Sequence, residues 1–353
     1  MRGLYVHVPF CLSKCPYCDF YSVPFDESLS ERYVRAVIRN VQAYGGKFDS
    51  VYFGGGTPIL IADNIAEVLR AADIAKGAEI TVECNPCEMT EEVLGTLFNA
   101  GVNRISAGVQ SLDDTVLKAL GRRHDASTAE KAILTAKKAG FDNISADIML
   151  ATPRQTIESL TDTLARLAAL PLTHVSAYML KIEPNTPFGK APPELPDDDE
   201  TADIYLRTVN ALERYGFGQY EISNFAKAGF ECRHNLKYWR REEYLGIGAA
   251  AHSLYEGRRF YIERNAADFA AAERQKDIAE GDIPDESEVY EERVMLGLRL
   301  SEGIAEELYK PLLKRLNYIP ERYYAIQNGR LSLTAEGFAV SNAIISTLLS
   351  QDF

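Results

Sequence analysis

The chain has no excess of basic charge, few cysteines and no long apolar stretch, and each shortage excludes a class of protein. Its 353 residues include 38 Lys and Arg against 51 Asp and Glu, a formal net charge of −13. Nonspecific nucleic-acid binding and binding to an anionic membrane surface both need a basic footprint, so neither is predicted. Six cysteines are too few for a disulfide framework, and no segment approaches the ~18 apolar residues of a membrane span.

We expect no targeting segment, because strand-like sequence begins at Gly3. Hydrophobic residues make up 46% of the chain, enough for one large domain with a smaller one beside it. We therefore expect a cytoplasmic protein that meets a membrane only through a partner, if at all. The oligomeric state is left open.

Three of the six cysteines fall within eight residues, as Cys11, Cys15 and Cys18 in the pattern C-x3-C-x2-C. A cubic [4Fe–4S] cluster takes four thiolates. Three protein ligands would leave one iron open to a small molecule, as catalytic zinc sites keep one open position. A zinc site usually has a fourth ligand nearby and favours C-x2-C pairs. The spacing therefore predicts a cluster, and thiolate ligands fit a reducing compartment.

A short apolar stretch recurs through the first two hundred residues, each time followed by a helical pattern. This alternation predicts a parallel sheet with right-handed crossovers. Six repeats indicate an α/β fold, a partial (βα)6 barrel. The expected strands are 4–8, 50–53, 79–83, 104–109, 144–149 and 174–180, and the expected helices are 29–44, 61–75, 90–100, 127–139 and 155–170.

Unusual or polar residues follow five successive predicted strands. The cysteine loop follows the first and the glycine-rich segment 54–58 the second, while Glu83, Gln110 and Asp147 lie at or near the ends of the next three. Each has an ordinary explanation, such as a tight turn or a helix cap. Barrels of βα units, however, build their active sites at the C-terminal ends of the strands. We therefore predict a single site at this rim.

With these motifs the chain resembles the oxygen-independent coproporphyrinogen III dehydrogenase group of the radical S-adenosylmethionine (SAM) superfamily. The likeness covers Y-V-H-V-P-F-C at 5–11, G-G-G-T-P at 54–58, G-V-Q-S at 108–111, L-G-R-R-H at 120–124, I-S-A-D at 144–147 and G-I-G at 246–248. One departure is A-T-P-R-Q-T at 151–156, where that group usually reads G-L-P-x-Q-T. This difference leaves the detailed structure of the loop at 151–156 open, but it does not change the expected fold.

The resemblance implies roles for individual residues. The three cysteines would hold the cluster, and SAM would bind its open iron. Acidic side chains suit the hydroxyls and the cationic groups of SAM, whereas Arg suits its carboxylate. The implied SAM-binding residues are Tyr5, Tyr17, Gly55, Gly56, Thr57, Glu83, Gln110, Arg122 and Asp147.

Two features distinguish branches of this group. The dehydrogenases have a further cysteine two residues past the third and an N-terminal extension, whereas here Phe20 fills that position and the first strand begins at Gly3. The segment H-N-L-K-Y-W at 234–239 matches the H-N-x-x-Y-W motif of a sister branch of haem chaperones. The resemblance implies that His234 is associated with haem, since haem iron takes a nitrogen, sulfur or phenolate ligand. His174, His252 and Cys232 stay open as alternatives.

The expected function is therefore haem binding and delivery to an acceptor haemoprotein. The alternatives are oxidative decarboxylation of coproporphyrinogen III and radical chemistry on another substrate. Cys84, Cys87 and Cys232 are expected to be structural.

We divide the chain into a barrel at 1–190, a barrel-closing region at 191–283 and a small helical, winged-helix-like domain at 284–353. Within the last two regions we expect helices at 201–215, 289–300, 304–316 and 336–349, and a hairpin strand at 329–334. From Asp285 onward the chain has 11 acidic and 7 basic residues, so DNA binding is not expected.

Overall fold

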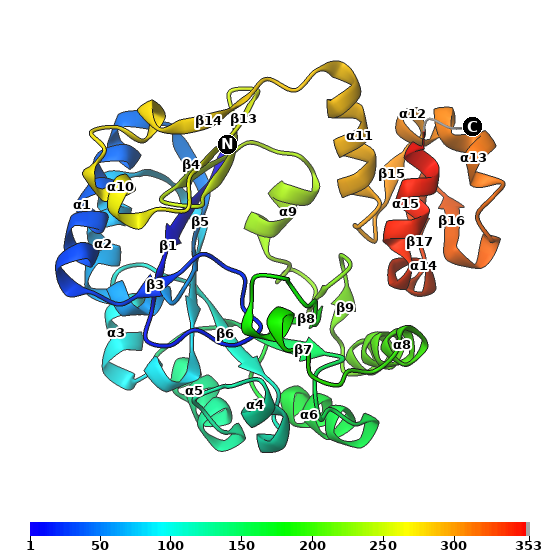
Figure 1. The fold of residues 1–353 in the computed structure, drawn as a ribbon, viewed down its shortest axis with the longest axis horizontal. Helices are drawn as coiled ribbons and strands as arrows, with labels where there is room; N and C mark the ends of the chain where they lie inside the picture. The colour runs from blue at the N-terminus through cyan, green and yellow to red at the C-terminus, as the bar shows by residue number, and fades with distance from the viewer. Residues whose placement is uncertain (351–353) are drawn as a thin grey trace.

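The computed structural model describes residues 1–350, which form a mixed α/β fold around one large sheet (Figure 1). The sheet has 12 strands in the order β14-β13-β12-β11-β1-β4-β5-β6-β7-β8-β10-β9. Its central strands are parallel: β11 (Tyr244–Ile247), β1 (Arg2–Val8), β4 (Lys47–Gly55), β5 (Asp73–Cys84), β6 (Arg104–Gln110), β7 (Asn143–Leu150) and β8 (His174–Met179).

The predicted βα order is therefore confirmed, and the helices lie around the outside of the sheet in Figure 1. They are α1 (Glu27–Tyr44), α2 (Ala62–Ala71), α3 (Glu91–Asn99), α4 (Asp114–Ala119), α5 (Ala126–Lys138), α6 (Ile157–Ala169) and α8 (Asp198–Arg214). One boundary was wrong: the helix expected at 61–75 ends at Ala71, and β5 already begins at Asp73. The acidic run before α8 begins that helix as a capping box, since Asp197 accepts from the backbone of Glu200.

The parallel strands alternate between apolar and polar residues. Along β6, Ile105, Ala107 and Val109 are fully buried against the outer helices, whereas Arg104, Ser106, Gly108 and Gln110 face a cavity inside the curve of the sheet. Parallel sheets covered on both faces usually read as continuous apolar runs. The alternation here shows that only the outer face packs as hydrophobic core, and that the inner face is built for polar contacts.

The region expected to close over the barrel also extends the sheet. Strand β11 pairs with β1 in parallel, and β12 (His252–Tyr255), β13 (Arg258–Ile262) and β14 (Ala279–Asp282) continue it antiparallel. At the other end, β10 (Asn224–Ala226) and β9 (Gly218–Gln219) follow β8. Smaller elements are β2 (Phe10–Cys11), β3 (Val23–Pro24), α7 (Pro187–Lys190), α9 (Arg233–Trp239) and α10 (Ala266–Ala271).

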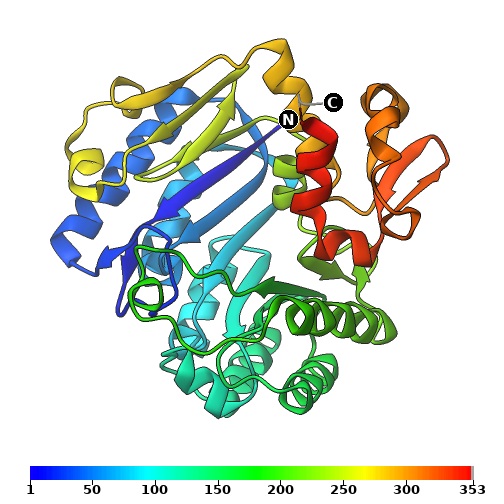
Figure 2. The same ribbon diagram turned by 45° about the vertical axis from the view of Figure 1, so that its right-hand side comes forward.

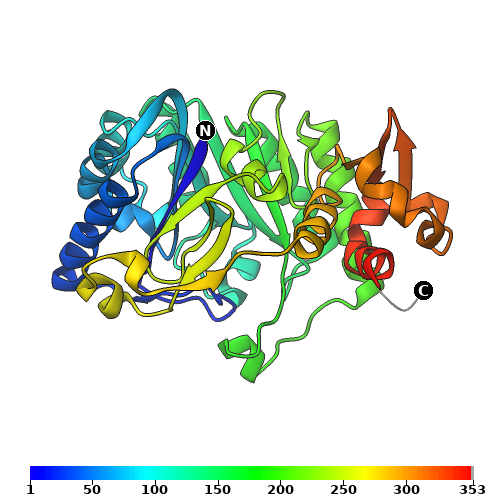
Figure 3. The same ribbon diagram turned by 90° about the horizontal axis from the view of Figure 1, so that it is seen from above.

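The C-terminal elements form a separate body beside the β8 side of the sheet (Figures 2 and 3). They comprise α11 (Glu286–Gly297), α12 (Glu306–Tyr309), α13 (Leu313–Leu316), α14 (Ala335–Ala339) and α15 (Ser341–Leu349) around strands β15 (Ile304–Ala305), β16 (Tyr324–Gln327) and β17 (Arg330–Leu333). The expected hairpin strand is β17, which pairs with β15 and β16.

Two helix predictions in this body were wrong. The segment 304–316 is not one helix, because Ile304 and Ala305 pair with β17 and because Pro311 has no N–H to continue the hydrogen bonding of α12. The final helix divides at Val340, whose φ of −118° and ψ of 20° leave the helical range. In the part of the chain that the structure describes, no helix is long and apolar enough to cross a membrane.

Gly95 lies in the middle of α3, and a Cβ added there would meet no atom within 4 Å. We expect Gly95→Ala to raise the free energy of unfolding by about 1 kcal/mol, because alanine loses less backbone entropy in a helix. Urea denaturation measures this. Gly77→Ala is the control: it also has open space, but its φ of +74° disfavours any side chain, so it should lose stability. A gain in both variants would contradict the argument.

Candidate functional site

A cavity of about 850 Å³ lies inside the curve of the sheet and opens at the C-terminal ends of the parallel strands. The sequence predicted twelve residues for the cluster and SAM, and all of them line this one cavity. They are Tyr5, Cys11, Cys15, Tyr17, Cys18, Gly55, Gly56, Thr57, Glu83, Gln110, Arg122 and Asp147. The single site expected at the rim is therefore present, whereas the role of each residue stays a prediction.

The three thiols of the cysteine loop are free and half-buried. The Thr57 hydroxyl lies 3.5 Å from Cys11 Sγ, and the Arg122 guanidinium lies 3.5 Å from Cys15 Sγ. Within residues 1–350, no three His, Cys, Asp or Glu side chains converge on a point where they could share one metal ion. The thiolates of a cubic cluster each bind a different iron and need no such convergence. Three free thiols on one loop are therefore compatible with a cluster that takes one thiolate on each of three irons.

Glu83 connects the glycine-rich loop to the floor of the cavity. Its Oε2 accepts from the Gly55 N–H at 3.1 Å, and its Oε1 accepts from the Tyr52 hydroxyl at 2.9 Å. Burial, together with the nearby Asp147 carboxylate, raises the pKa of Glu83 to about 7. Burial also raises the pKa of Asp147, which accepts from the Ser106 hydroxyl at 3.1 Å. These two carboxyl groups are suited to accept from hydroxyl or ammonium groups of a ligand.

Arg122 is held from two sides beside the cysteine loop. It donates to the Gly108 carbonyl at 2.8 Å and to Asn85 Oδ1 at 3.0 Å. Its guanidinium lines the cavity and is suited to donate to a carboxylate of a ligand. The sequence prediction missed Asn85, which also donates to Thr57 Oγ1 at 3.1 Å. Its position two residues after Glu83, past the end of a strand, was the available signal.

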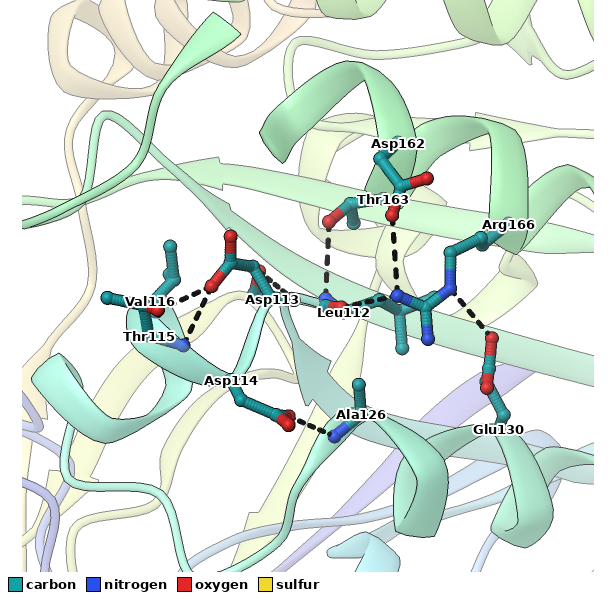
Figure 4. A network of polar contacts seen from close by, with 11 residues as sticks. Leu112, Asp113, Asp114, Thr115, Val116, Ala126, Glu130, Asp162, Thr163 and Arg166 are labelled. Carbon is teal, nitrogen blue, oxygen red and sulfur yellow. Dashed lines mark hydrogen bonds and ion pairs between the residues drawn. The ribbon is translucent and has the colours of Figure 1, made fainter. Parts of the chain in front are cut away.

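A network of polar contacts fixes the chain that follows Gln110 (Figure 4). The Leu112 N–H donates to Thr163 Oγ1 at 3.2 Å, and Arg166 donates to the Leu112 carbonyl at 2.7 Å. Arg166 also pairs with Glu130 at 2.9 Å, which ties α5 to α6. Gln110 itself has a φ of +66°, an uncommon conformation held in place by these contacts. The network thereby positions one of the predicted SAM-binding residues.

His7, which the sequence analysis did not assign, orients Tyr5. Its Nδ1 lies 2.9 Å from the Tyr5 hydroxyl, and its Nε2 lies 3.1 Å from the Tyr21 carbonyl. Burial lowers the pKa of His7 to about 4, so the ring is neutral at pH 7. A neutral ring has one donor and one acceptor, which matches donation to the carbonyl and acceptance from the tyrosine.

His234 lies at the opposite end of the strands from the cysteine loop. Its Nδ1 is 2.9 Å from Ser50 Oγ, and its Nε2 is 2.8 Å from the Tyr238 hydroxyl. The residue has 0% exposure, and its ring stacks on Tyr52 with centroids 5.3 Å apart. Both ring nitrogens are thus engaged beneath the cavity floor. In this arrangement the imidazole offers no free nitrogen to an iron.

The three alternative haem ligands lie in different surroundings. His174 is fully buried, with Nδ1 at 2.7 Å from Ser145 Oγ and Nε2 at 2.8 Å from the Tyr220 hydroxyl. Cys232 is fully buried at the start of α9. His252 alone among the three is exposed, and it lines the mouth of the cavity.

Fold and site together define a protein of the radical SAM superfamily, whose family model matches residues 5–167. The solved structure of coproporphyrinogen III oxidase (HemN) from Escherichia coli, a radical SAM enzyme, superposes with a TM-score of 0.83, over 99% of this chain and 90% of that one, at 21% identity. Heme chaperone HemW of Lactococcus lactis is 34% identical over 99% of this chain and 98% of its own. That of Haemophilus influenzae is 41% identical over 71% of this chain and 69% of its own.

The chain therefore belongs to the HemW family. Membership of the radical SAM superfamily implies a [4Fe–4S] cluster and SAM.

Gly56 leaves no room for a side chain at the edge of the cavity. A Cβ there would lie 2.6 Å from the Phe10 carbonyl oxygen and 2.9 Å from that of Val8. We expect Gly56→Ala to push the glycine-rich loop away from the cysteine loop and to cost about 2 kcal/mol of stability. Urea denaturation checks the cost, and equilibrium dialysis with SAM checks the displacement. A variant as stable as the wild type would contradict the close packing.

The buried imidazole of His234 makes stability depend on pH. Burial lowers its pKa to about 3, whereas an unfolded histidine titrates near 6.5. The unfolded chain thus binds a proton that the folded chain excludes. The contribution of His234 to the free energy of unfolding is therefore complete above pH 6.5 and is lost progressively as the pH falls below it. Between pH 7 and pH 5 the loss is about 2 kcal/mol. The difference in the free energy of unfolding between wild type and His234→Gln should therefore become smaller by this amount from pH 7 to pH 5. A difference that does not change with pH would refute the conclusion that His234 is buried in its neutral form.

Proposed function

We propose that this protein binds haem and passes it to an acceptor haemoprotein, with a [4Fe–4S] cluster on Cys11, Cys15 and Cys18 and SAM beside it. The observation that carries the proposal is the placement of the H-N-L-K-Y-W segment. Asn235 and Tyr238 line the cluster cavity, and the neighbouring Trp239 lines a second cavity. The Lactococcus lactis relative, which matches 99% of this chain, is named a heme chaperone, and this agrees with the assignment.

The residues around the first cavity fit SAM. Glu83 and Asp147 would accept from its hydroxyl and ammonium groups, and the Arg122 guanidinium would donate to its carboxylate. The chemistry that a bound, reduced cluster would supply is one electron for SAM. In this proposal the fold positions the other predicted SAM-binding residues around the first cavity. They are Tyr5, Tyr17, Gly55, Gly56, Thr57 and Gln110.

His234 supports the haem site through Tyr238 in this proposal. The imidazole holds the Tyr238 hydroxyl at 2.8 Å, and Tyr238 in turn forms part of the wall of both cavities. Direct ligation by His234, as the sequence motif suggested, would require the ring to give up one of its two hydrogen bonds.

An anaerobic haem titration followed by absorption spectroscopy tests the function. We expect saturable binding of one haem per chain, and transfer of that haem to an apo-haemoprotein. His234→Ala should weaken haem binding and leave the positions of the haem absorption bands unchanged, because in this proposal His234 is not the residue that ligates the iron. Shifted bands in the variant would instead identify His234 as the ligand.

Haem adheres to many apolar surfaces, so an acidic protein unrelated to this one serves as the control. Binding no tighter than that of the control would overturn the proposal. The enzyme alternative would then be tested with coproporphyrinogen III, SAM and a reductant, where formation of protoporphyrinogen would establish it.

A further inference from the structure

A second cavity of about 750 Å³ lies where the partial barrel meets the C-terminal elements. Its walls come from the ends of β8 and α9, the segment 221–224, Arg299 after α11, and residues 338–343 at the junction of α14 and α15. Tyr178, Asn235 and Tyr238 line both this cavity and the first one. The two cavities are therefore neighbours that share one wall.

The second cavity has an apolar and partly open lining. It contains Trp239, the only tryptophan of the chain, and three large side chains that are unusually exposed: Tyr178 at 42%, Met179 at 36% and Val340 at 38%. Phe338 completes the apolar side. A concave space of this size, mostly apolar with a few polar groups, is typical of sites for small molecules and cofactors.

Two charged groups face this lining without forming an ion pair in the described part of the chain. Arg299 donates to Asn342 Oδ1 at 3.0 Å, lies 5.9 Å from the centre of the Trp239 ring, and keeps a buried Nε with no partner. Glu221 is fully buried, and the polar groups closest to its carboxyl are the backbone of Ser223 and the backbone and side chain of Asn224. Burial raises the pKa of Glu221 to about 7. Arg299 thus places a cationic side chain in the lining of the second cavity, without an ion pair in the described part of the chain.

We propose that haem binds in this second cavity, with its ring against Trp239, a propionate at Arg299 and the Met179 sulfur at the iron. This inference rests on the proposed function and adds the location and the ligand. Haem is a flat apolar ring with two carboxylates, which matches an aromatic lining with one cation at its edge. The cavity lining contains no His and no Cys, and Met179 is its one sulfur ligand.

Tyr178 is a weaker choice of ligand than Met179. Its hydroxyl already interacts with the side chains of Ser176 and Asn224, so it would have to give up these contacts to reach an iron. This site also explains why the motif histidine is distant from free space. Asn235, Tyr238 and Trp239 form the cavity walls, while His234 fixes Tyr238 from behind.

A cavity-filling variant tests the location. Ala339 is half-buried in α14 and lines the second cavity, so Ala339→Trp should weaken haem binding at least about tenfold. Ala325→Trp is the matched control, because Ala325 is half-buried in β16 of the same C-terminal body and lies outside this lining. SAM binding, measured by its effect on the electron paramagnetic resonance spectrum of the cluster, should be unchanged in both variants.

Two smaller substitutions test the contacts. Met179→Leu should shift the absorption bands of bound haem, because it removes the sulfur and keeps the volume. Arg299→Gln should weaken haem binding about tenfold, whereas Arg299→Lys should keep most of it. Haem dimethyl ester, which has no free carboxylate, should bind wild type and Arg299→Gln equally well.

The outcomes separate the site from the function. Saturable haem binding by wild type that is equally tight in Ala339→Trp and in Arg299→Gln would overturn this site and leave the haem function standing. Bands unchanged in Met179→Leu would overturn the ligand. Absence of saturable binding in the wild type would instead overturn the proposed function itself.

Discussion

The structure depends on polar side chains facing one another inside a parallel sheet. Burying a charge is costly unless neighbouring groups compensate for it. The interior places the guanidinium of Arg104, exposed at only 1%, among the carboxylates of Glu79, Glu83 and Asp147. Burial lowers the pKa of Arg104, but the neighbouring Cys232, Glu79, Tyr52 and Tyr220 raise it by more, so the guanidinium stays charged. This balance lets a hydrophobic outer face coexist with an inner face that can contact ligands.

Helix α9 covers this interior at the N-terminal ends of the parallel strands, opposite the cysteine loop. Glu79 accepts from the backbone N–H groups of Arg233 at 3.1 Å and His234 at 3.0 Å, where the start of a helix favours negative charge. His234 then bonds to Ser50 on β4, and Gly3 on β1 is close enough that a Cβ there would lie 3.0 Å from its ring. The H-N-L-K-Y-W segment at 234–239 therefore also has a structural role, because His234 packs between strands β1 and β4.

Much of this could be predicted from the sequence, because its signals are local. Apolar runs marked the six parallel strands, and the polar residues at their ends marked the rim. The sequence could not give β11, which has only four residues and pairs with β1 across more than two hundred positions. Nor could it show that His234 turns away from open space, because a motif identifies residue types and not their orientation. The helix expected at 304–316 failed because pairing with β17 overrode local preference.

The shared wall gives the two cavities a physical relation. The first has about 850 Å³ for the cluster and SAM together, so haem there would compete with SAM for the same space. With haem in the second cavity, as proposed, the two ligands would lie on opposite sides of Tyr178, Asn235 and Tyr238, which line both cavities. Neither ligand then has to leave for the other to bind.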